Sequence, residues 1–351
     1  MIGANGQVGT EVCLLLAHRG VSVVPICRSK PGSALLRRWG LQCRHGSLAS
    51  PEAARELLAG CDTVVDFSLP GGYPSDLRPL LRELIGNSFR YSEPDARHVY
   101  ASTIAAFGTG ARDGRFRDHW IAHTTYGWSK RYAEKVVRQA AARTEKQAYI
   151  LRLGEVNGEL QRHARRRVQA LASLRPARVA IPSGLSFAVF TYSVAEAIQS
   201  ISEGRQSPGL YTLVSNPRLS WRSLLQYYLD QLDFEPEIII EERGGSGSAK
   251  GTVFRALERI AESYRNEISS YLTARFPSVD RLLRFERSRH KAAAQASQIP
   301  TGVYRPFLTC HTGEAPGRRL PGLTTDLNAV LGELGRFRAW LRERQPEILS
   351  Y

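Results

Sequence analysis

The sequence lacks a hydrophobic run long enough to cross a membrane. Its apolar stretches fall far short of the roughly 18 residues that a spanning helix needs. A secretory signal is also missing, because glycines stand where its apolar segment would lie. We therefore expect a protein that does not span a membrane and that acts in the cytoplasm.

Cysteine is scarce and scattered, with five residues in 351 positions. None belongs to a Cys-x-x-Cys pair or a Cys/His cluster, which argues against a zinc site and against a disulfide framework. The histidines likewise show no metal-ligand spacing. We predict no metal site and a reducing compartment.

Acidic residues are in deficit. The chain has 33 Asp and Glu against 48 Lys and Arg, a formal net charge of +15. Such an excess favours anionic partners, including nucleotides, sugar diphosphates, lipid headgroups and nucleic acid. An arginine-rich surface supplied by a GC-rich genome explains the excess equally well. No nucleic-acid-binding signature accompanies the charge, so we expect a small anionic substrate and no nucleic acid.

Short apolar runs alternate with helical patterns through the first half of the chain. This alternation predicts an α/β fold whose parallel sheet is covered by helices on both faces. The expected strands are 21–26, 41–45, 62–69, 97–103 and 148–154. The first expected helix follows a turn at residue 4 and ends at Gly20. Three further helices are expected at 33–39, at 50–60 with Ser50 as N-cap, and at 126–142.

A glycine loop opens the chain as "GANGQVG". In a Rossmann unit, glycines at the positions of Gly3, Gly6 and Gly9 allow a tight turn and a close approach of backbone to pyrophosphate. The following helix presents free N–H groups to the phosphates. A generic glycine turn before a helix is the alternative. Only two residues precede Gly3, so we expect a truncated first strand, with an apolar strand of about four to six residues encoded upstream of Met1.

The stretch "YGWSK" places Tyr126 and Lys130 four residues apart, on one face of a helix. A phenol can act there as acid and base while the ammonium lowers its pKa. Upstream, "YASTIAAFG" carries Ser102 and Thr103 at the end of a strand, where a hydroxyl could hold the reacting oxygen. A Tyr-x-x-x-Lys pair alone is common on solvated helices.

In this order, "GANGQVG", "STIAAFG", "YGWSK" and "LRLGEVNG" resemble the extended short-chain dehydrogenase/reductase family, also called the NAD-dependent epimerase/dehydratase family. The resemblance covers roughly residues 1–230. It implies a doubly wound Rossmann-type sheet with a smaller, mostly helical C-terminal substrate domain, and a homodimer. It also implies hydride transfer between a nicotinamide and a substrate that is usually a nucleotide-sugar.

The resemblance carries roles onto matching positions. Tyr126 would be the acid/base, Lys130 would bind the nicotinamide ribose, and Thr103 would be the catalytic hydroxyl. The implied cofactor-binding residues are Gly3, Asn5, Gly6, Gln7, Val8, Gly9, Arg28, Lys30, Ser68, Ser102, Tyr126 and Lys130. The implied substrate-binding residues are Glu155, Asn157 and Arg166.

Several positions depart from the family pattern. Ser47 replaces an adenine-contacting Asp, Asp66 replaces a histidine, and Glu155 replaces a substrate-contacting Asn. An arginine common before a late helix is also missing in "SFAVFTYSVAEA". These changes leave the cofactor chemistry in place and indicate a substrate pocket unlike that of a standard uridine-diphosphate-sugar enzyme.

The end of the second strand indicates which cofactor is preferred. A carboxylate there binds the adenosine ribose of NAD, but here Cys27 takes its place and Arg28 and Lys30 follow. Two cations suit the 2′-phosphate of NADP. Solvated loop residues are the alternative. We predict a preference for NADP over NAD.

The domain prediction assigns residues 1–155 to the dinucleotide-binding domain, with 186–215 returning to it. Residues 156–185 and 216–245 would form the substrate domain, and 246–351 a helical extension of unknown role. Within that extension, apolar residues recur at helical spacing in 253–272 and 327–341.

Two classes of function remain open. The first is an NAD(P)-dependent epimerase, dehydratase or reductase of a nucleotide-linked sugar or a similar polar substrate. The second is a non-catalytic NADP-binding regulator or scaffold. A hydroxysteroid-like or ketone reductase of the same family is a narrower variant of the first.

Overall fold

The computed structural model describes residues 1–70, 74–107, 125–174, 178–215, 219–232, 234, 237–243, 317–324 and 326–345, with 276, 278, 285 and 303–304. The apolar stripe expected at 253–272 lies outside these residues.

A parallel sheet forms the centre of the molecule. Ile2 bridges both Ile26 and Asp66, so it joins two groups of strands into one sheet. The order across it is β2, β1, Ile2, β3, β4, β5 and β9. The strands are β1 (Ile26–Cys27), β2 (Arg44–His45), β3 (Thr63–Asp66), β4 (Arg97–Thr103), β5 (Ala148–Leu153) and β9 (Gly209–Leu213).

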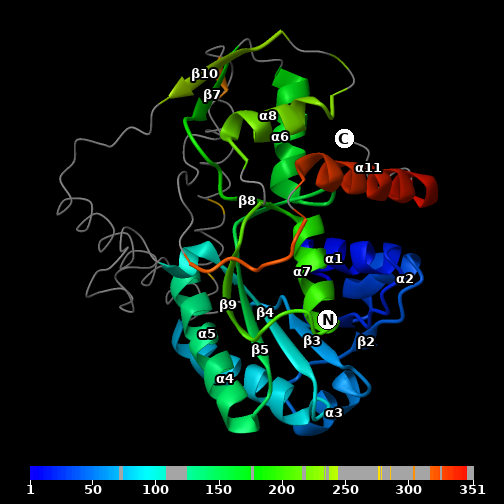
Figure 1. Ribbon diagram of the computed structural model, residues 1–351. Helices are drawn as coiled ribbons and strands as arrows, with labels where there is room; N and C mark the ends of the chain where they lie inside the picture. Colours follow the sequence, from blue (N-terminus) through cyan, green and yellow to red (C-terminus); the bar gives the residue numbers. More distant parts are fainter. Residues whose placement is uncertain are drawn as a thin grey trace, which may run out of the picture.

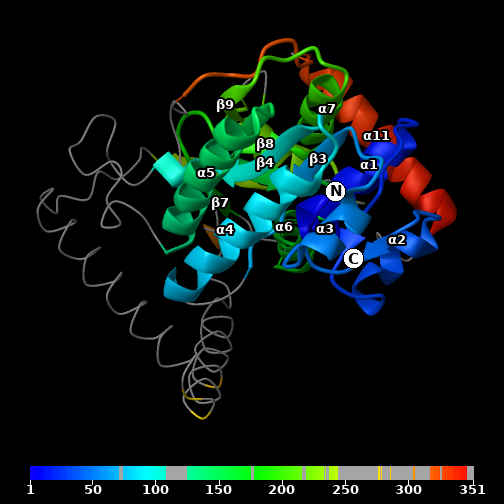
Figure 2. The same cartoon turned by 90° about the horizontal axis from the view of Figure 1, so that it is seen from below.

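Helices cover both faces of this sheet (Figures 1 and 2). Apolar residues of α1 and α7 share one core with the sheet, while those of α3, α4 and α5 form cores on the other side. The helices are α1 (Gln7–His18), α2 (Ala34–Arg38), α3 (Pro51–Leu58), α4 (Pro74–Tyr91), α5 (Thr125–Thr144) and α7 (Thr191–Ser202), with short 3-10 turns at Pro31–Ser33 and Ile104–Phe107. This arrangement confirms the predicted Rossmann-like α/β fold.

Met1 and Ile2 lie between β1 and β3 at the centre of the sheet. Ile2 bonds to β3 through its N–H to Val65 and its C=O from Phe67, at 2.8 and 3.0 Å. Met1 bonds to the chain before β1, donating to Val24 at 2.7 Å. The strand predicted over 21–26 was wrong in extent, since only Ile26 and Cys27 are strand. Residues 21–25 have no neighbouring strand among the described residues with which to form a ladder.

A second region follows β5. Strands β6 (Glu155–Asn157) and β8 (Ala188–Phe190) pair in parallel, and β7 (Arg178–Pro182) pairs with β10 (Ile239–Arg243) and β11 (Val303–Tyr304). Helices α6 (Arg162–Leu174) and α8 (Trp221–Leu229) close a core with these strands. The division into a dinucleotide-binding and a substrate domain stays a prediction.

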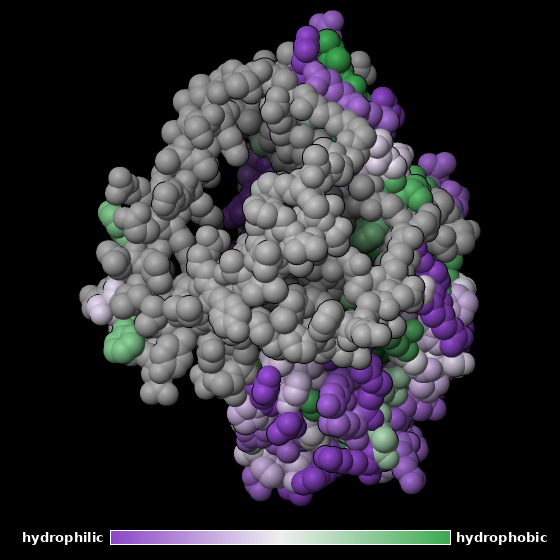
Figure 3. Space-filling model, turned by 90° about the vertical axis from the view of Figure 1, so that its left-hand side faces the viewer, coloured by the Kyte–Doolittle hydropathy of each residue, from purple (hydrophilic) through white to green (hydrophobic). Residues whose placement is uncertain are grey.

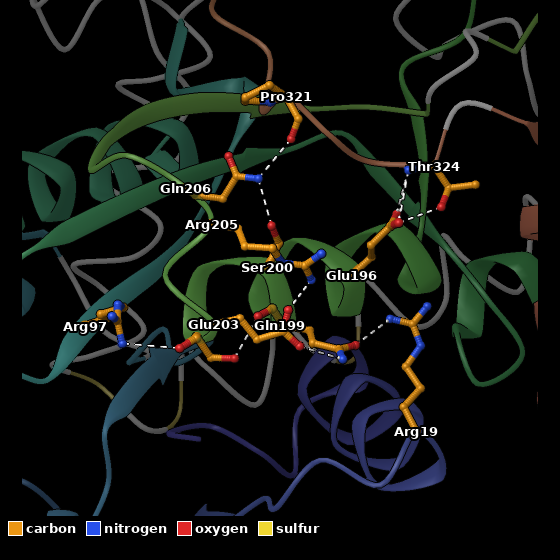
Figure 4. A network of polar contacts seen from close by, with 11 residues as sticks. Arg19, Arg97, Glu196, Gln199, Ser200, Glu203, Arg205, Gln206, Pro321 and Thr324 are labelled. Atoms are coloured by element: carbon orange, nitrogen blue, oxygen red, sulfur yellow. Dashed lines mark hydrogen bonds and ion pairs between the residues drawn. The ribbon is translucent and has the colours of Figure 1, made fainter.

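The tail of the chain returns to the main sheet. Arg319 bridges Thr212 at the edge strand β9. Glu196 of α7 then accepts bonds from the Thr324 N–H and hydroxyl, and Gln206 donates to the Pro321 carbonyl at 2.9 Å (Figure 4). These contacts carry the tail across α7.

Helix α11 (Leu327–Arg344) completes the tail and begins at Asp326, whose side chain accepts from the Asn328 N–H. The stripe predicted at 327–341 supplies its buried residues Val330, Leu334, Phe337 and Leu341. Trp340 packs against Trp39, with ring centroids 4.4 Å apart, and beside His18 of α1. The tail therefore covers α1 and α2 of the Rossmann unit (Figure 1).

Polar residues dominate the described part of one face of the molecule. On the face shown in Figure 3, hydrophilic residues prevail where described residues reach the surface, and apolar ones are scattered. Among the described helices, none is both long and apolar enough to cross a bilayer.

Candidate active site

The glycine loop packs tightly against the end of β3. Gly3 has a φ of +70°, and a Cβ there would lie 2.8 Å from the Ser68 nitrogen. A Cβ on Gly9 would lie 2.5 Å from the Gly3 carbonyl oxygen. Both positions therefore require glycine for the loop's own geometry. Gly6 is less crowded: its φ is −72° and a Cβ would lie 3.2 Å from the same oxygen.

Helix α1 begins directly after Gly6 without a side-chain cap. Its first turn contains no acidic residue, and Gly6 offers no acceptor to the free N–H groups. Such N–H groups carry partial positive charge and suit a phosphate. Gly6 and Gln7 are exposed at this point, so the helix start is open to a ligand.

A cavity of about 550 Å³ lies in front of this helix start, at the carboxyl ends of the central strands. It brings the glycine loop together with the Tyr–Lys helix and the strand-end hydroxyls. Its lining comprises Gly6, Gln7, Val8, Gly9, Phe67, Leu69, Ala101, Ser102, Thr103, Tyr126, Lys130, Leu153, Gly154, Val156, Gln161 and His163.

Lys130 is buried at the floor of this cavity. Its Nζ donates to the Ala101 carbonyl at 2.8 Å and lies 4.8 Å from the centre of the Tyr100 ring. Burial lowers the pKa of Lys130 to about 8, and the carboxyl groups of Asp66 and Glu134 oppose that shift. The two carboxyl groups therefore favour the charged form of Lys130, against the effect of burial.

Tyr126 stands at the cavity wall with 48% of its surface exposed. Partial burial raises the pKa of its phenol, while a hydrogen bond from the Thr103 side chain lowers it. Thr103 also accepts from the Ala105 N–H at 3.2 Å, which holds its hydroxyl at the start of the 3-10 turn. Lys130 is not among the groups that shift the pKa of Tyr126, so the expected lowering of the phenol pKa by this ammonium is not found in the structure.

A buried carboxylate, that of Glu134, holds residues next to the site in place, and the sequence analysis did not identify it. Glu134 accepts from Ser102 at 2.6 Å and makes a two-point ion pair with Arg152, at 2.8 and 2.6 Å. Glu134 follows Lys130 by four residues on the same helix, and that spacing was the available signal. The pair fixes Ser102 and the end of β4, because breaking a buried ion pair is costly.

Asp66 also faces Lys130. Burial raises the pKa of its carboxyl group, and the Ser68 and Lys130 groups oppose that shift. Its Oδ1 accepts from the Ser68 N–H at 2.7 Å. The residue that replaces the family's histidine thus shapes the turn after β3 that packs on Gly3.

Other predicted cofactor residues lie further out. Arg28 and Lys30 are exposed beyond the end of β1 and do not line the cavity. Asn5 is exposed, with its amide nitrogen 2.9 Å from where a Cβ of Gly32 would lie. Ser68 follows β3, under the glycine loop. Their binding roles stay predictions.

The three predicted substrate residues occupy different environments. Glu155 forms an ion pair with Arg167, and His163 lies 3.6 Å from the same carboxylate. Asn157 is buried and bonded to the Tyr228 hydroxyl, whereas Arg166 is exposed. The cavity itself is lined in this region by Gln161 and His163, which are not among the substrate residues that the resemblance implied. Substrate roles for Glu155, Asn157 and Arg166 stay predictions.

The residues present fit a dinucleotide. An uncapped helix start, the glycines Gly6 and Gly9 and a buried lysine surround one cavity. In the part of the chain that the structure describes, no cluster of His, Cys, Asp and Glu could hold a metal ion.

Comparison with known proteins agrees with this geometry. The model of the "NAD dependent epimerase/dehydratase family" matches residues 1–180, about half of the chain. The spore coat polysaccharide biosynthesis protein SpsK of Bacillus subtilis (strain 168) is 24% identical over 241 residues, which cover 68% of this chain and 80% of that protein.

Two solved structures share the fold. UDP-N-acetylglucosamine 4-epimerase from Bacillus cereus superposes with a TM-score of 0.53 at 15% identity, covering 76% of this chain and 97% of that one. The Bordetella bronchiseptica enzyme WbmH in complex with NAD+ gives a TM-score of 0.50 at 20% identity, covering 70% and 85%. The family match over half of the sequence, together with this fold, shows that the chain belongs to the NAD-dependent epimerase/dehydratase family.

Proposed function

We propose that the protein is an NAD(P)-dependent epimerase, dehydratase or reductase acting on a nucleotide-linked sugar or a similar polar, anionic substrate, with Tyr126 as its acid/base. One observation carries the proposal. The glycine loop, the Thr103 hydroxyl, Tyr126 and Lys130 all line a single cavity of about 550 Å³. A protein that only binds a dinucleotide does not need a phenol, a hydroxyl and a buried ammonium at the same wall.

The chain's residues divide the work as follows. The glycine loop and the start of α1 would hold a nicotinamide dinucleotide, which would supply hydride transfer at this cavity. Tyr126 exchanges the proton of the substrate hydroxyl, and Thr103 donates a hydrogen bond that favours the phenolate. Lys130 binds the nicotinamide ribose, the role that the resemblance implies. The helix start at Gly6 and Gln7 receives the pyrophosphate.

The relative and the cavity both support the proposed substrate class. SpsK is named for spore coat polysaccharide biosynthesis, which makes a sugar-containing substrate the first candidate for this chain. The cavity wall beyond Tyr126 carries Gln161 and His163, which can hydrogen-bond sugar hydroxyls. The net charge of +15 favours an anionic group such as a diphosphate on the substrate.

Replacing Tyr126 with Phe tests the catalytic role. The ring is kept and the proton is lost, so we expect turnover to fall by about two orders of magnitude or more while dinucleotide affinity is retained. Turnover is followed by mass spectrometry with a panel of nucleotide-sugars and both cofactors, and affinity by calorimetry. Tyr132→Phe on the same helix is the matched control, because its hydroxyl has no hydrogen-bond partner among the described residues.

Unchanged turnover in Tyr126→Phe would exclude Tyr126 as the acid/base. Tight dinucleotide binding by the unmodified chain with no product from any nucleotide-sugar would favour the non-catalytic regulator or scaffold instead.

We propose further that NADP is preferred over NAD, through Arg28 with help from Lys30. The strand β1 ends at Cys27 without a carboxylate, and both cations are exposed beside that end. Arg28→Ala should weaken NADP by about ten- to a hundredfold and leave NAD nearly unchanged. Calorimetry with both cofactors measures this. Equal weakening of both, or tighter binding of NAD by the parent, would overturn the preference.

A further inference from the structure

The loop between β6 and α6 carries a polar side chain to the wall of the candidate active site. Gln161 ends this loop and lines the cavity of about 550 Å³, although only 2% of its surface is exposed. Its carbonyl accepts from the Arg165 N–H at 3.0 Å, which ties it to the start of α6. A buried amide of this kind needs acceptors for its NH2 group and a donor for its oxygen.

The amide nitrogen of Gln161 has two acceptors on α1. Its Nε2 donates to the Glu11 carboxylate at 2.7 Å and to the Gln7 carbonyl at 3.2 Å. An ionised carboxylate and a backbone carbonyl accept hydrogen bonds and do not donate them. A turned amide would therefore set its oxygen against two other oxygens. The NH2 group of Gln161 is held toward α1 for this reason.

Glu11 is built into its position under the loop. It is buried and accepts from the N–H groups of Glu159 and Leu160, at 2.8 and 3.0 Å, and from the Thr191 hydroxyl at 2.7 Å. With the amide, it has four partners and all of them donate, which suits an ionised carboxylate. Gly158 leaves the room for it, because a Cβ there would collide with the Glu11 Oε1.

The amide oxygen of Gln161 is left for a ligand. No described residue donates to this Oε1, and yet it is not one of the enclosed polar atoms that lack a partner, so it opens onto the cavity. The ammonium of Lys130 and the N–H groups at the start of α1 are donors at the same cavity. Gln161 adds a fixed acceptor, and a hydroxyl is the ligand group that such an acceptor binds.

We propose that Gln161 binds a sugar hydroxyl of the ligand through its amide oxygen, and that Glu11 is the positioning residue that fixes this orientation. The inference rests on the proposed function for its ligand: the sugar of a nucleotide-linked substrate and a ribose of the dinucleotide both offer such a hydroxyl. An ether, carboxylate or phosphate oxygen is disfavoured at the same place, because two acceptors would meet there without a proton between them.

Ligands that lack single hydroxyl groups test the contact. One arm titrates UDP-glucose and its singly deoxygenated analogues in the presence of saturating dinucleotide. The other titrates NAD and NADP that lack one ribose hydroxyl. Both arms are run at pH 8, because burial raises the pKa of Glu11 to about 7. Loss of the contacted hydroxyl should weaken binding to the parent by about tenfold and leave binding to Gln161→Met unchanged. The arm that shows this difference identifies the source of the hydroxyl.

Thr191→Val is the matched control. It removes another of the four donors to Glu11, so it should lower Tm about as much as Gln161→Met does, but Thr191 does not line the cavity. This variant should keep the tenfold dependence on the ligand hydroxyl. Glu11→Gln frees the amide to turn, so it should lose that dependence. Added to Gln161→Met, it should cost no further affinity.

The orientation of the amide can be measured without a ligand. In protein labelled with 15N-glutamine, both Nε2 protons of Gln161 should exchange with water at least about tenfold more slowly than those of the exposed Gln226. Fast exchange of either proton would overturn the orientation. An equal loss of affinity in the parent and in Gln161→Met for every deoxygenated ligand would overturn the contact. Neither readout depends on turnover, so this failure is distinct from a failure of Tyr126 as the acid/base.

Discussion

At the scale of single residues, the three glycines of the first loop have different structural roles. Gly3 has a positive φ and Gly9 packs on the Gly3 carbonyl, so both are needed to form the loop. Gly6 has an ordinary φ and moderate space, and it stands exposed at the start of α1. Its lack of a side chain therefore serves a ligand more than the fold.

Alanine substitutions should separate the role in ligand binding from the role in stabilising the loop. Gly6→Ala should weaken dinucleotide binding by about tenfold or more with little change in Tm, because its methyl group meets the approaching phosphate. Gly9→Ala should lower Tm, since its methyl group would lie 2.5 Å from a backbone oxygen. Calorimetry and thermal denaturation measure the two effects. A Gly6→Ala variant that binds as tightly as the parent would place the phosphate elsewhere.

The sequence predicted the residues whose role depends on local spacing. Tyr126 and Lys130 share a helix face, and Thr103 ends a strand, so their meeting at one cavity could be expected. Gln161 and His163 could not be found this way, because they reach the cavity through the path of α6 after β6. The way the chain enters α6, rather than the spacing of its residues, decides which face of this arginine-rich helix lies toward the site.

At the scale of elements, α11 is tied to the Rossmann unit by charge as well as by apolar packing. Arg338 makes a two-point ion pair with the buried Glu159, at 2.6 and 2.8 Å. The N–H of Glu159 in turn donates to Glu11 of α1 at 2.8 Å. Burial raises the pKa of the Glu11 carboxyl to about 7, and hydrogen bonds from Gln161 and Thr191 oppose that shift. A chain of polar contacts thus runs from the tail to the helix after the glycine loop.

Replacing Arg338 should show how much the Arg338–Glu159 ion pair contributes to stability. Arg338→Gln leaves the Glu159 charge buried with weaker partners, so we expect the free energy of unfolding to fall by about 3 kcal/mol. Urea denaturation measures the change, and Arg342→Gln on the exposed face of α11 is the control. In the double variant with Glu159→Gln, much of the loss should be recovered. A loss no larger than that of the control would mean that α11 is held by apolar contacts alone.

The elements show why sequence patterns predicted some boundaries and not others. The strand over 97–103 and the helix cap at Ser50 depend on local patterns and were confirmed. Residues 21–25 have the apolar pattern of a strand, but a strand also needs a neighbour to pair with, and only Ile26 and Cys27 have one. Strand pairing depends on two segments, so the sequence of one segment does not show where its strand begins and ends.

At the scale of the whole molecule, the tail belongs to the core that holds the glycine helix. Leu320, Leu323, Phe337 and Leu341 are buried in the same cluster as α1 and α7. The sequence predicted a helical stripe at 327–341 but not its partner, because the stripe shows that one face is apolar and not which surface covers it.

A chain ending at Arg243 should therefore fail as a folding unit. Four large apolar side chains would be lost from the core, at about 2 kcal/mol each, and the sum is comparable with the stability of a typical domain. We expect this truncation to be insoluble or to unfold without cooperativity in circular dichroism. A chain ending at Gln345 is the control and should melt like the parent. Cooperative melting of the shorter chain would make the tail dispensable.

The contact between Trp39 and Trp340 gives the protein an optical signal of its own. Their ring centroids are 4.4 Å apart and their planes meet at 34°. Two indoles at that distance couple their electronic transitions, so the pair should give a split band in circular dichroism that neither tryptophan gives alone. The band would disappear when α11 leaves α2, while the secondary structure of both helices remained. Docking of the last helix could then be followed in real time, without a dye and in the presence of any ligand that does not absorb in the same range.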